Sequence, residues 1–184
     1  MYFAPKNITL KDGRTAVLRS PQPERDAPEM LRYLIDVAGE TPYLGVYPEE
    51  RASMTVEQEQ GFLRRMLDAE GELSLIAEVD GQLAGNAQVT FSPRLKMRHR
   101  GRIAIGLRKA YWNLGLGTAM LRELIDVARQ REGVIQLELE CIEGNSRARA
   151  LYEKLGFRIV GMVPNAIRLK DGTLLNEYLM NKEL

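Results

Sequence analysis

A glycine-containing turn is the segment of this sequence best suited to chemistry. It follows a strand-like run, precedes a helical pattern and reads Trp112-Asn113-Leu114-Gly115-Leu116-Gly117-Thr118. The first N–H groups of a helix have no intrahelical partner, and the helix dipole favours negative charge at that end. Glycine also lets the backbone approach a bulky anion closely. We therefore expect a phosphate or diphosphate here, although the same residues also fit a strand-to-helix turn without a ligand.

Two other phosphate-binding motifs fit the turn less well. A dinucleotide-binding fingerprint needs three glycines and a following parallel βαβ unit, whereas only Gly115 and Gly117 stand in register. A Walker loop needs Gly-Lys followed by Ser or Thr, whereas Thr118 follows Gly117 directly. The turn alone therefore does not name its ligand.

A second informative stretch runs from Asn145 to Phe157. Asn145 is a good N-cap residue for a short helix, and Gly156 would end that helix. One face of the helix carries Ala148, Leu151, Tyr152 and Leu155. Tyr152 is either a core residue on this apolar face or a phenol that can give up a proton.

Together the two stretches resemble the GNAT family of acetyl-CoA-dependent N-acetyltransferases. The run from Trp112 to Gly117 resembles the family's pyrophosphate loop, (Gln/Arg)-x-x-Gly-x-Gly/Ala, with Trp112 in place of the usual Gln or Arg. The family's strand–helix motif near the thioester resembles the run Asn145-x-x-Ala148-x-x-Leu-Tyr152-x-x-x-Gly156-Phe157. The order of the elements agrees as well, so the resemblance covers nearly the whole chain.

The resemblance implies a fold, a domain organisation and an activity. The fold is expected to be α+β, of the GNAT type, with a mixed and mostly antiparallel central sheet flanked by helices. Residues 1–184 are expected to form a single domain. The expected enzyme transfers an acetyl group from its co-substrate acetyl-CoA to a primary amine of a small-molecule or peptide acceptor. The transfer is expected to be direct, within a ternary complex.

The resemblance also implies which residues bind acetyl-CoA. Backbone amides from Leu114 to Thr118 would hold the diphosphate. The pantetheine arm would lie along the strand at 105–107 like an added β-strand, and N–H groups of that strand would polarise the thioester carbonyl. The residues expected to bind the cofactor are Ile105, Gly106, Leu107, Trp112, Asn113, Leu114, Gly115, Leu116, Gly117, Thr118 and Asn145.

Tyr152 stands where the family keeps its general acid, so the resemblance makes it the expected catalytic residue. The leaving thiolate needs a proton, and a nearby phenol can supply it: a thiol has an ordinary pKa of about 8.5 and a phenol one of about 10.

The group that deprotonates the acceptor is left open. Some relatives carry a glutamate on the strand before the glycine turn, but here no acidic residue lies between Leu95 and Arg122. The remaining candidates are water and the carboxylates of Glu40, Glu138, Glu140 and Glu143. Each of these carboxylates also fits a solvated surface position.

Other charged and aromatic residues lie near these motifs. The basic run from Arg94 to Arg102 is expected to be a solvated stretch that protects a sheet edge, with attraction of an acidic substrate as the alternative. Arg108 and Lys109 are either exposed or in contact with cofactor phosphates. The segment 40–50 contains two prolines, a glycine and two tyrosines, and is expected to be a loop that selects the acceptor.

The elements that must position these residues follow from the hydrophobic periods. Strands are expected at 8–10, 15–19, 73–77, 83–91, 98–107, 134–142, 158–163, 167–170 and 173–180. Helices are expected at 26–39, 55–71, 116–133 and 145–156. Asp12-Gly13 and Asp80-Gly81 predict hairpin turns, and Asp26 and Thr55 predict N-caps with capping boxes. One parallel crossover is expected, through the third of these helices.

Composition limits the remaining classes. The chain has 184 residues, 45% of them apolar, and 26 Lys and Arg against 25 Asp and Glu. A net charge of +1 excludes generic binding to nucleic acid or to an anionic membrane as a default. A single cysteine, Cys141, and a single histidine, His99, predict no metal site and no internal disulfide. Without a membrane-length apolar run or a signal-like N-terminus, a cytoplasmic protein is expected.

Two alternatives to an enzyme fit the same residues. A GNAT-fold domain that binds or senses acyl-CoA without turnover fits the missing strand glutamate. A protein for another phosphate ligand would share only the glycine turn. The sequence does not determine the acceptor, the physiological acyl group or the oligomeric state, although the resemblance allows a homodimer.

Overall fold

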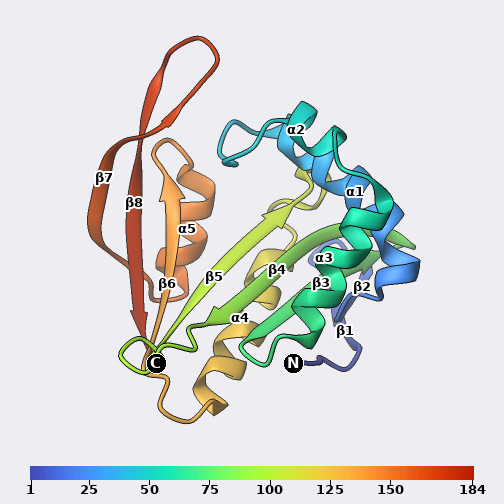
Figure 1. Ribbon diagram of the computed structural model, residues 1–184, viewed down its shortest axis with the longest axis horizontal. Coiled ribbons are helices and arrows are strands. Elements are labelled where there is room, and N and C mark those ends of the chain that lie inside the picture. The colour runs from blue at the N-terminus through green and yellow to red at the C-terminus, as the bar shows by residue number, and fades with distance from the viewer.

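The computed structural model describes all residues from 1 to 184 and contains one eight-stranded sheet, shown in Figure 1. Its spatial strand order is β1-β2-β3-β4-β5-β6-β8-β7. The strands are β1 (Lys6–Thr9), β2 (Thr15–Arg19), β3 (Glu72–Val79), β4 (Gln82–Phe91), β5 (Arg100–Leu107), β6 (Gln136–Ile142), β7 (Arg158–Arg168) and β8 (Leu174–Glu183). Only β5 and β6 are parallel neighbours. The predicted α+β fold, with a mostly antiparallel sheet and one parallel crossover, is confirmed.

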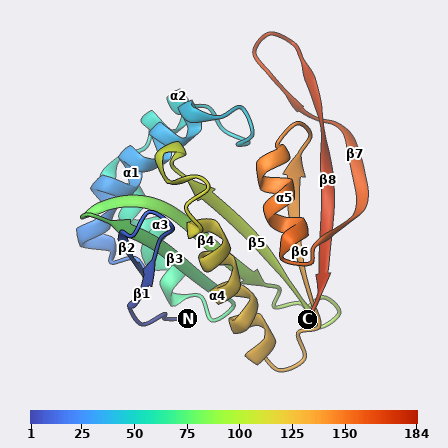
Figure 2. The same cartoon turned by 180° about the vertical axis from the view of Figure 1, so that it is seen from behind.

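Helices cover both faces of the sheet. Figure 1 shows α1 (Pro23–Glu40), α2 (Pro48–Ala52) and α3 (Val56–Asp68) over one face. Figure 2 shows α4 (Leu116–Gln130) and α5 (Ser146–Lys154) over the other face. The larger apolar core lies under α4 and α5, and a smaller one lies under α1 and α3. None of the helices is both long and apolar enough to cross a membrane.

Of the two predicted capping boxes, one is confirmed and the other is wrong. The hydroxyl of Thr55 accepts the N–H of Gln58 at 3.3 Å, and the Gln58 side chain accepts the N–H of Thr55 at 2.8 Å. In contrast, α1 begins at Pro23 with Gln22 as its N-cap residue, so Asp26 lies inside the helix. Proline suits the first helical position because the N–H that it lacks would have no partner there.

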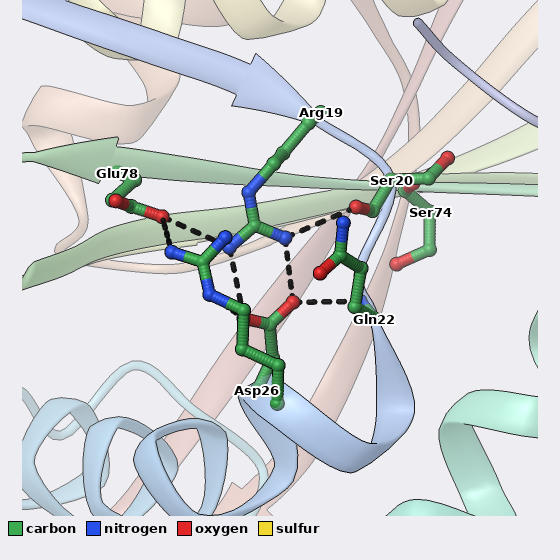
Figure 3. A network of polar contacts seen from close by, with 7 residues as sticks. Arg19, Ser20, Gln22, Asp26, Ser74 and Glu78 are labelled. Atoms are coloured by element: carbon green, nitrogen blue, oxygen red, sulfur yellow. Dashed lines mark hydrogen bonds and ion pairs between the residues drawn. The ribbon is translucent and has the colours of Figure 1, made fainter. Parts of the chain in front are cut away.

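Asp26 belongs instead to a buried network of ion pairs, shown in Figure 3. Its carboxylate accepts two hydrogen bonds from Arg19, at 2.5 and 2.8 Å, and one from the N–H of Gln22 at 2.6 Å. Arg19 also donates to Glu78 on β3 at 2.9 Å. Arg19 and Asp26 are only 6% and 5% exposed. The network ties the start of α1 to β2 and β3.

Several other boundaries differ from the sequence prediction by a few residues. The segment 40–50 is not entirely a loop, because α2 begins at Pro48. α3 ends at Asp68 rather than at Gly71. Gly71 serves a different purpose: a Cβ there would stand 2.8 Å from the carbonyl oxygen of Phe91, so only glycine permits this close approach.

β5 and β6 are paired at one end only. Residues 100–102 of β5 pair with residues 136–138 of β6. Beyond that point β5 continues to Leu107 and β6 to Ile142, but the two strands no longer pair with each other. Both views show them diverging (Figure 1, Figure 2). The crossover helix α4 follows the open end of β5 and starts at the glycine turn.

β7 and β8 form a long hairpin at the edge of the sheet (Figure 1). The two short strands expected at 158–163 and 167–170 are one strand, β7, with an irregular register between Val163 and Ile167. β8 pairs with β6 on its other side, so β7 is the free edge. The exposed apolar side chains of this hairpin are Ile159, Val160, Met162, Val163, Leu174 and Leu179.

Candidate functional site

A cavity of about 690 Å³ lies where β5 and β6 diverge. It is lined by residues 102–107 of β5, by the end of β6 and by the start of α5. Residues 40–45, at the end of α1 and in the loop after it, also line it. The predicted site residues that line the cavity are Ile105, Gly106, Leu107, Trp112, Asn145 and Tyr152. The fold therefore brings the second motif and Trp112 of the glycine turn to one cavity that is bordered from both faces of the sheet. Residues 113–118 of the turn do not line it.

The unpaired edge of β5 presents backbone groups to this cavity. In a strand, the N–H and C=O groups of successive residues point to alternate sides. The indole N–H of Trp112 donates to the carbonyl of Leu107 at 2.9 Å. The N–H of Arg108 points the other way and donates to the carbonyl of Ala84 at 3.0 Å. The alternation then places the N–H and C=O of Ile105 on the cavity side, where β6 no longer pairs with them.

The glycine turn leaves a row of backbone donors unused. The N–H groups from Asn113 to Thr118 have no hydrogen-bond partner in the chain. Gly115 is the N-cap residue of α4, adopts a φ of 89° and offers no side-chain cap. At Gly117 a Cβ would stand 3.0 Å from Leu151 and 3.1 Å from Leu107. The positive φ therefore favours glycine at position 115, and close packing favours it at position 117. The free N–H groups suit an anion.

Arg147 is a candidate that the sequence analysis missed. Its guanidinium lies over the ring of Trp112, 4.2 Å from the ring centroid, and both residues line the cavity. A cation at this place adds positive potential near the free N–H groups of the glycine turn. In the sequence, only its position inside the second motif could have indicated Arg147 as a site residue, because its contact with Trp112 of the glycine turn depends on the tertiary fold.

Tyr152 packs against the core and also borders the cavity. Its ring meets that of Phe157 edge-on, with centroids 6.3 Å apart. Its hydroxyl makes no hydrogen bond within the chain, although the side chain is only 7% exposed. Burial raises the pKa of Tyr152, so the phenol keeps its proton at neutral pH.

Asn145 caps α5 as predicted, because its side chain accepts the N–H of Ala148 at 3.2 Å. Asn145 also lines the cavity, so its capping role and a place in the site are compatible. Cys141 is buried, as expected for a small apolar core residue, and burial raises the pKa of its thiol.

Three of the four candidate carboxylates have side-chain partners. Glu138 accepts a hydrogen bond from Arg100 at 2.9 Å and does not line the cavity. Glu140 lines the cavity but forms an ion pair with Arg102. Glu143 lies outside the lining and accepts a hydrogen bond from a tyrosine hydroxyl. The two arginines therefore pair across to β6, while Arg94, Lys96, Arg98 and Arg102 are exposed, so the basic run is largely solvated as expected.

Two carboxylates line the cavity without forming an ion pair. Glu40 accepts the backbone N–H of Lys109 at 2.5 Å. Glu177, on β8 opposite Ile142, was not among the predicted candidates. No local pattern marks it, because only strand pairing brings β8 to the site. Burial raises the pKa of Glu177, and the nearby charge of Glu140 raises it further.

Arg108 does not point at the glycine turn. It donates to the carbonyl of Leu83 at 2.8 Å and forms ion pairs with Asp36 and Glu29 on α1. The contact with cofactor phosphates that the sequence left open for Arg108 therefore lacks support, since its guanidinium is already engaged.

The loop after α1 lines the cavity opposite α5. The hydroxyl of Tyr43 donates to the carbonyl of Gly144 at 3.0 Å and so bridges the two sides of the opening. Tyr47, in contrast, is the N-cap residue of α2 and does not line the cavity. Of the two tyrosines in the predicted acceptor segment, Tyr43 is the one at the site.

Known proteins share this fold. Residues 29–157 match the family model described as the Acetyltransferase (GNAT) family. The chain belongs to the GNAT family of acetyltransferases. The crystal structure of a GNAT-family acetyltransferase from Streptococcus pneumoniae superposes on it with a TM-score of 0.84 at 30% identity, covering 92% of this chain and 99% of that one.

Two proteins named as N-acetyltransferases are also similar in sequence. L-amino acid N-acetyltransferase AaaT of Escherichia coli is 28% identical over 116 residues, which are 63% of this chain and 71% of that protein. N-alpha-acetyltransferase RimI of Mycobacterium tuberculosis is 45% identical over 58 residues, 32% of this chain and 34% of that protein. The structure of yncA from Salmonella typhimurium, with its cofactor acetyl-CoA, shares the fold with a TM-score of 0.76 at 19% identity, covering 92% and 94% of the two chains.

As a GNAT member, the enzyme is an N-acetyltransferase that uses acetyl-CoA. Its residues fit that co-substrate. The free N–H groups from Asn113 to Thr118 suit a diphosphate, and the unpaired edge of β5 at Ile105 suits an extended amide chain.

Proposed function

We propose that this acetyltransferase passes the acetyl group directly to a primary amine while both substrates are bound. The cavity where β5 and β6 diverge carries the proposal, because elements of both sheet faces line it. α5 lies on one face, and the loop after α1 lies on the other. Two substrates can then enter from opposite faces and meet at β5, which removes the need for a covalent enzyme intermediate.

An α-amino group is the acceptor class that we propose. One relative is named for L-amino acids and another for N-alpha acetylation. The carboxylates of Glu40 and Glu177 give the cavity two negative charges without ion-pair partners, which favour an ammonium group.

Backbone groups hold the co-substrate in this proposal. The N–H groups from Asn113 to Thr118 bind the diphosphate, and Arg147 adds positive charge beside them. The edge of β5 from Ile105 to Leu107 pairs with the amide arm, and its free N–H polarises the reacting carbonyl. Acetyl-CoA supplies an acyl group activated as a thioester, and the chain supplies position and charge stabilisation.

Tyr152 donates the proton of its hydroxyl to the departing sulfur. In water this transfer is uphill, because a phenol has a higher ordinary pKa than a thiol. Inside the cavity a thiolate is also poorly solvated, so its affinity for the proton rises together with that of the phenolate. The free hydroxyl of Tyr152 supports this role, since no protein acceptor competes for its proton.

Glu40 and Glu177 are the proposed proton acceptors for the ammonium, directly or through water. A raised pKa suits Glu177 for this task, because a base works best when its pKa lies near the working pH.

Three matched variants test the base. Glu40→Gln and Glu177→Gln remove the two candidates, and Glu143→Gln makes the same change outside the cavity. The variant that removes the base should lower kcat/KM by about 10²–10⁴-fold at neutral pH and abolish the acidic limb of the pH profile. If all three variants behave like the wild type, water accepts the proton.

The competing function is a sensor that binds acyl-CoA without turnover. The experiment mixes the purified protein with acetyl-CoA and a panel of amines, and follows release of free thiol. Thiol release with any amine supports the enzyme. Saturable acetyl-CoA binding without release for every amine favours the sensor, and no binding refutes both.

We also propose a homodimer that forms along β7. β7 has one unpaired side at the edge of the sheet, and four exposed apolar side chains lie on it: Ile159, Val160, Met162 and Val163. An exposed apolar edge strand tends to pair with another strand, and two copies of β7 can pair about a twofold axis.

A further inference from the structure

A second cavity, of about 320 Å³, lies between the sheet and helices α1 and α3. Its walls are mostly apolar and include Met30, Leu63 and Met66. It shares residues 104–106 of β5 with the larger cavity. The two cavities are therefore neighbours at the strand where the acceptor amine is proposed to react.

Glu59 and Arg51 both line the second cavity, and each has a buried polar atom without a partner. Glu59 is 1% exposed, and its Oε2 accepts no hydrogen bond. Nε of Arg51 donates none, and Nη1 of Arg51 only approaches the sulfur of Met54 at 3.8 Å. Buried polar groups in folded proteins are nearly always paired. An unused acceptor and an unused donor at one cavity indicate that a polar group of a ligand forms hydrogen bonds with both.

The charges of this cavity indicate which group fits. Arg51 and Glu59 carry opposite charges, so together they are neutral. A charged ligand group would leave one buried charge uncompensated, which is unfavourable. A neutral group that both donates and accepts would satisfy Oε2 of Glu59 and Nε of Arg51 together. Burial raises the pKa of Glu59 and the charge of Arg51 opposes that rise, as expected for two side chains at the same cavity.

We propose that the second cavity binds the side chain of the acceptor and selects a neutral end group that both donates and accepts hydrogen bonds, such as a primary carboxamide. The apolar stem packs against Met30, Leu63 and Met66, and the end group donates to Glu59 and accepts from Arg51. The inference rests on the proposed function only in taking residues 104–106 as the place where the acceptor amine reacts.

A matched series of acceptors tests this selectivity. L-glutamine, L-glutamate, L-lysine and L-norleucine have side chains of similar length that end in carboxamide, carboxylate, ammonium and methyl. Their α-N-acetylated forms are titrated into the protein with CoA by calorimetry, which needs no turnover. The glutamine derivative should bind at least about tenfold more tightly than each of the others. Equal binding of all four, or no binding, overturns the proposal and leaves water as the only occupant.

The experiments distinguish failure of the proposed carboxamide subsite, the second cavity, from failure of the proposed acetyl transfer. A carboxamide preference in binding without thiol release from acetyl-CoA would retain the subsite and refute direct transfer. Thiol release at equal rates with all four amino acids would retain the activity and refute the subsite.

Substitutions at the charged pair should change the preference rather than abolish it. Glu59→Gln leaves Arg51 charged. The ratio of the affinity for the glutamate derivative to that for the glutamine derivative should then rise at least about tenfold above its wild-type value. Arg51→Gln leaves Glu59 charged and should favour the lysine derivative instead. Glu57→Gln is the control, since Glu57 is exposed in the same helical turn and does not line this cavity. A merely structural role for Glu59 would lower stability without inverting selectivity, and if one variant fails to fold, the other still tests the opposite inversion.

Discussion

Tyr152 packs in the core and is the proposed proton donor, and one substitution separates these two roles. Its ring packs edge-on against Phe157, while its hydroxyl stays free of protein partners at the cavity. Phenylalanine keeps the ring and removes the proton. The substitution therefore distinguishes packing from proton donation with little disturbance of the core.

Tyr152→Phe should lower kcat by about 10²–10⁴-fold, the usual effect of losing a general acid. The Kd of acetyl-CoA should stay nearly unchanged, because the hydroxyl acts on the departing thiol. Steady-state kinetics with thiol detection and calorimetric titration measure the two quantities. An unchanged kcat would show that Tyr152 only packs.

The free N–H groups at the start of α4 are better tested at Thr118 than at Gly117, where any side chain would press on Leu151 and Leu107. Thr118→Glu places a negative charge beside the proposed diphosphate and should raise the Kd of acetyl-CoA at least about tenfold. Gln130→Glu, at the exposed other end of α4, should leave that Kd unchanged. Equal calorimetric Kd values for the two variants would contradict a diphosphate site at these N–H groups.

At the scale of elements, the network of Figure 3 holds α1 in place. Arg19 extends from the end of β2, and Asp26 faces it from the first turns of α1. α1 in turn supplies Val37 and Glu40 to the cavity wall. The buried pair thus supports one side of the proposed acceptor site.

Asp26→Ala should lower the free energy of unfolding by about 3 kcal/mol at neutral pH, because buried Arg19 would lose its bidentate partner and keep only Glu78. Burial by itself would raise the pKa of Asp26, but hydrogen bonds from Arg19 and Gln22 outweigh it and hold the pKa below its ordinary value of 3.8. The stabilisation is therefore complete above about pH 4 and is lost as the pH falls through the lowered pKa. Denaturant unfolding at several pH values should show that the difference in the free energy of unfolding between variant and wild type becomes smaller at acidic pH.

Asp126→Ala is the matched control for this measurement. Asp126 pairs with Arg129 at 3.3 Å, but its side chain is 57% exposed. Its loss should change the free energy of unfolding by less than about 1 kcal/mol at any pH. Equal losses for Asp26→Ala and Asp126→Ala would contradict a stabilising role for the buried network.

At the scale of the whole molecule, the sheet has a divided middle and an exposed apolar edge. The division between β5 and β6 forms the site, and the edge at β7 is the surface proposed for a second copy. β8 links the two features, because it carries Glu177 into the cavity and pairs with β7 on its other side.

The paired substitution Val160→Lys with Met162→Lys should convert a dimer into a monomer, because it places two charges on the apolar edge. Light scattering after gel filtration should give twice the 20.8 kDa of one chain for the wild type and that mass itself for the variant. Ile135→Lys alters another apolar side chain, 60% exposed and outside the hairpin, and should leave the dimer intact. A monomeric wild type would refute the proposed interface.

The sequence by itself determined the features that depend on near neighbours. The Asp-Gly turns, the Thr55 cap and most strands and helices were predicted, because turn chemistry and hydrophobic period act over a few residues. The glycine turn and the motif ending at Phe157 were enough to identify the family. Asp26 was misassigned for the same reason: its spacing to Glu29 matches a capping box, and its true partner, Arg19, lies on another element.

Only the tertiary structure decided which distant side chains share a site. Pairing of β8 with β6 brings Glu177 to the cavity, the packing of α5 places Arg147 over Trp112, and the layer of α1 and α3 buries Glu59 beside the sheet. It also showed which charges are already paired, so that Glu138 and Arg108 could be set aside. Electrostatic partners and burial depend on contacts between elements far apart in the chain, and local sequence patterns do not predict those contacts.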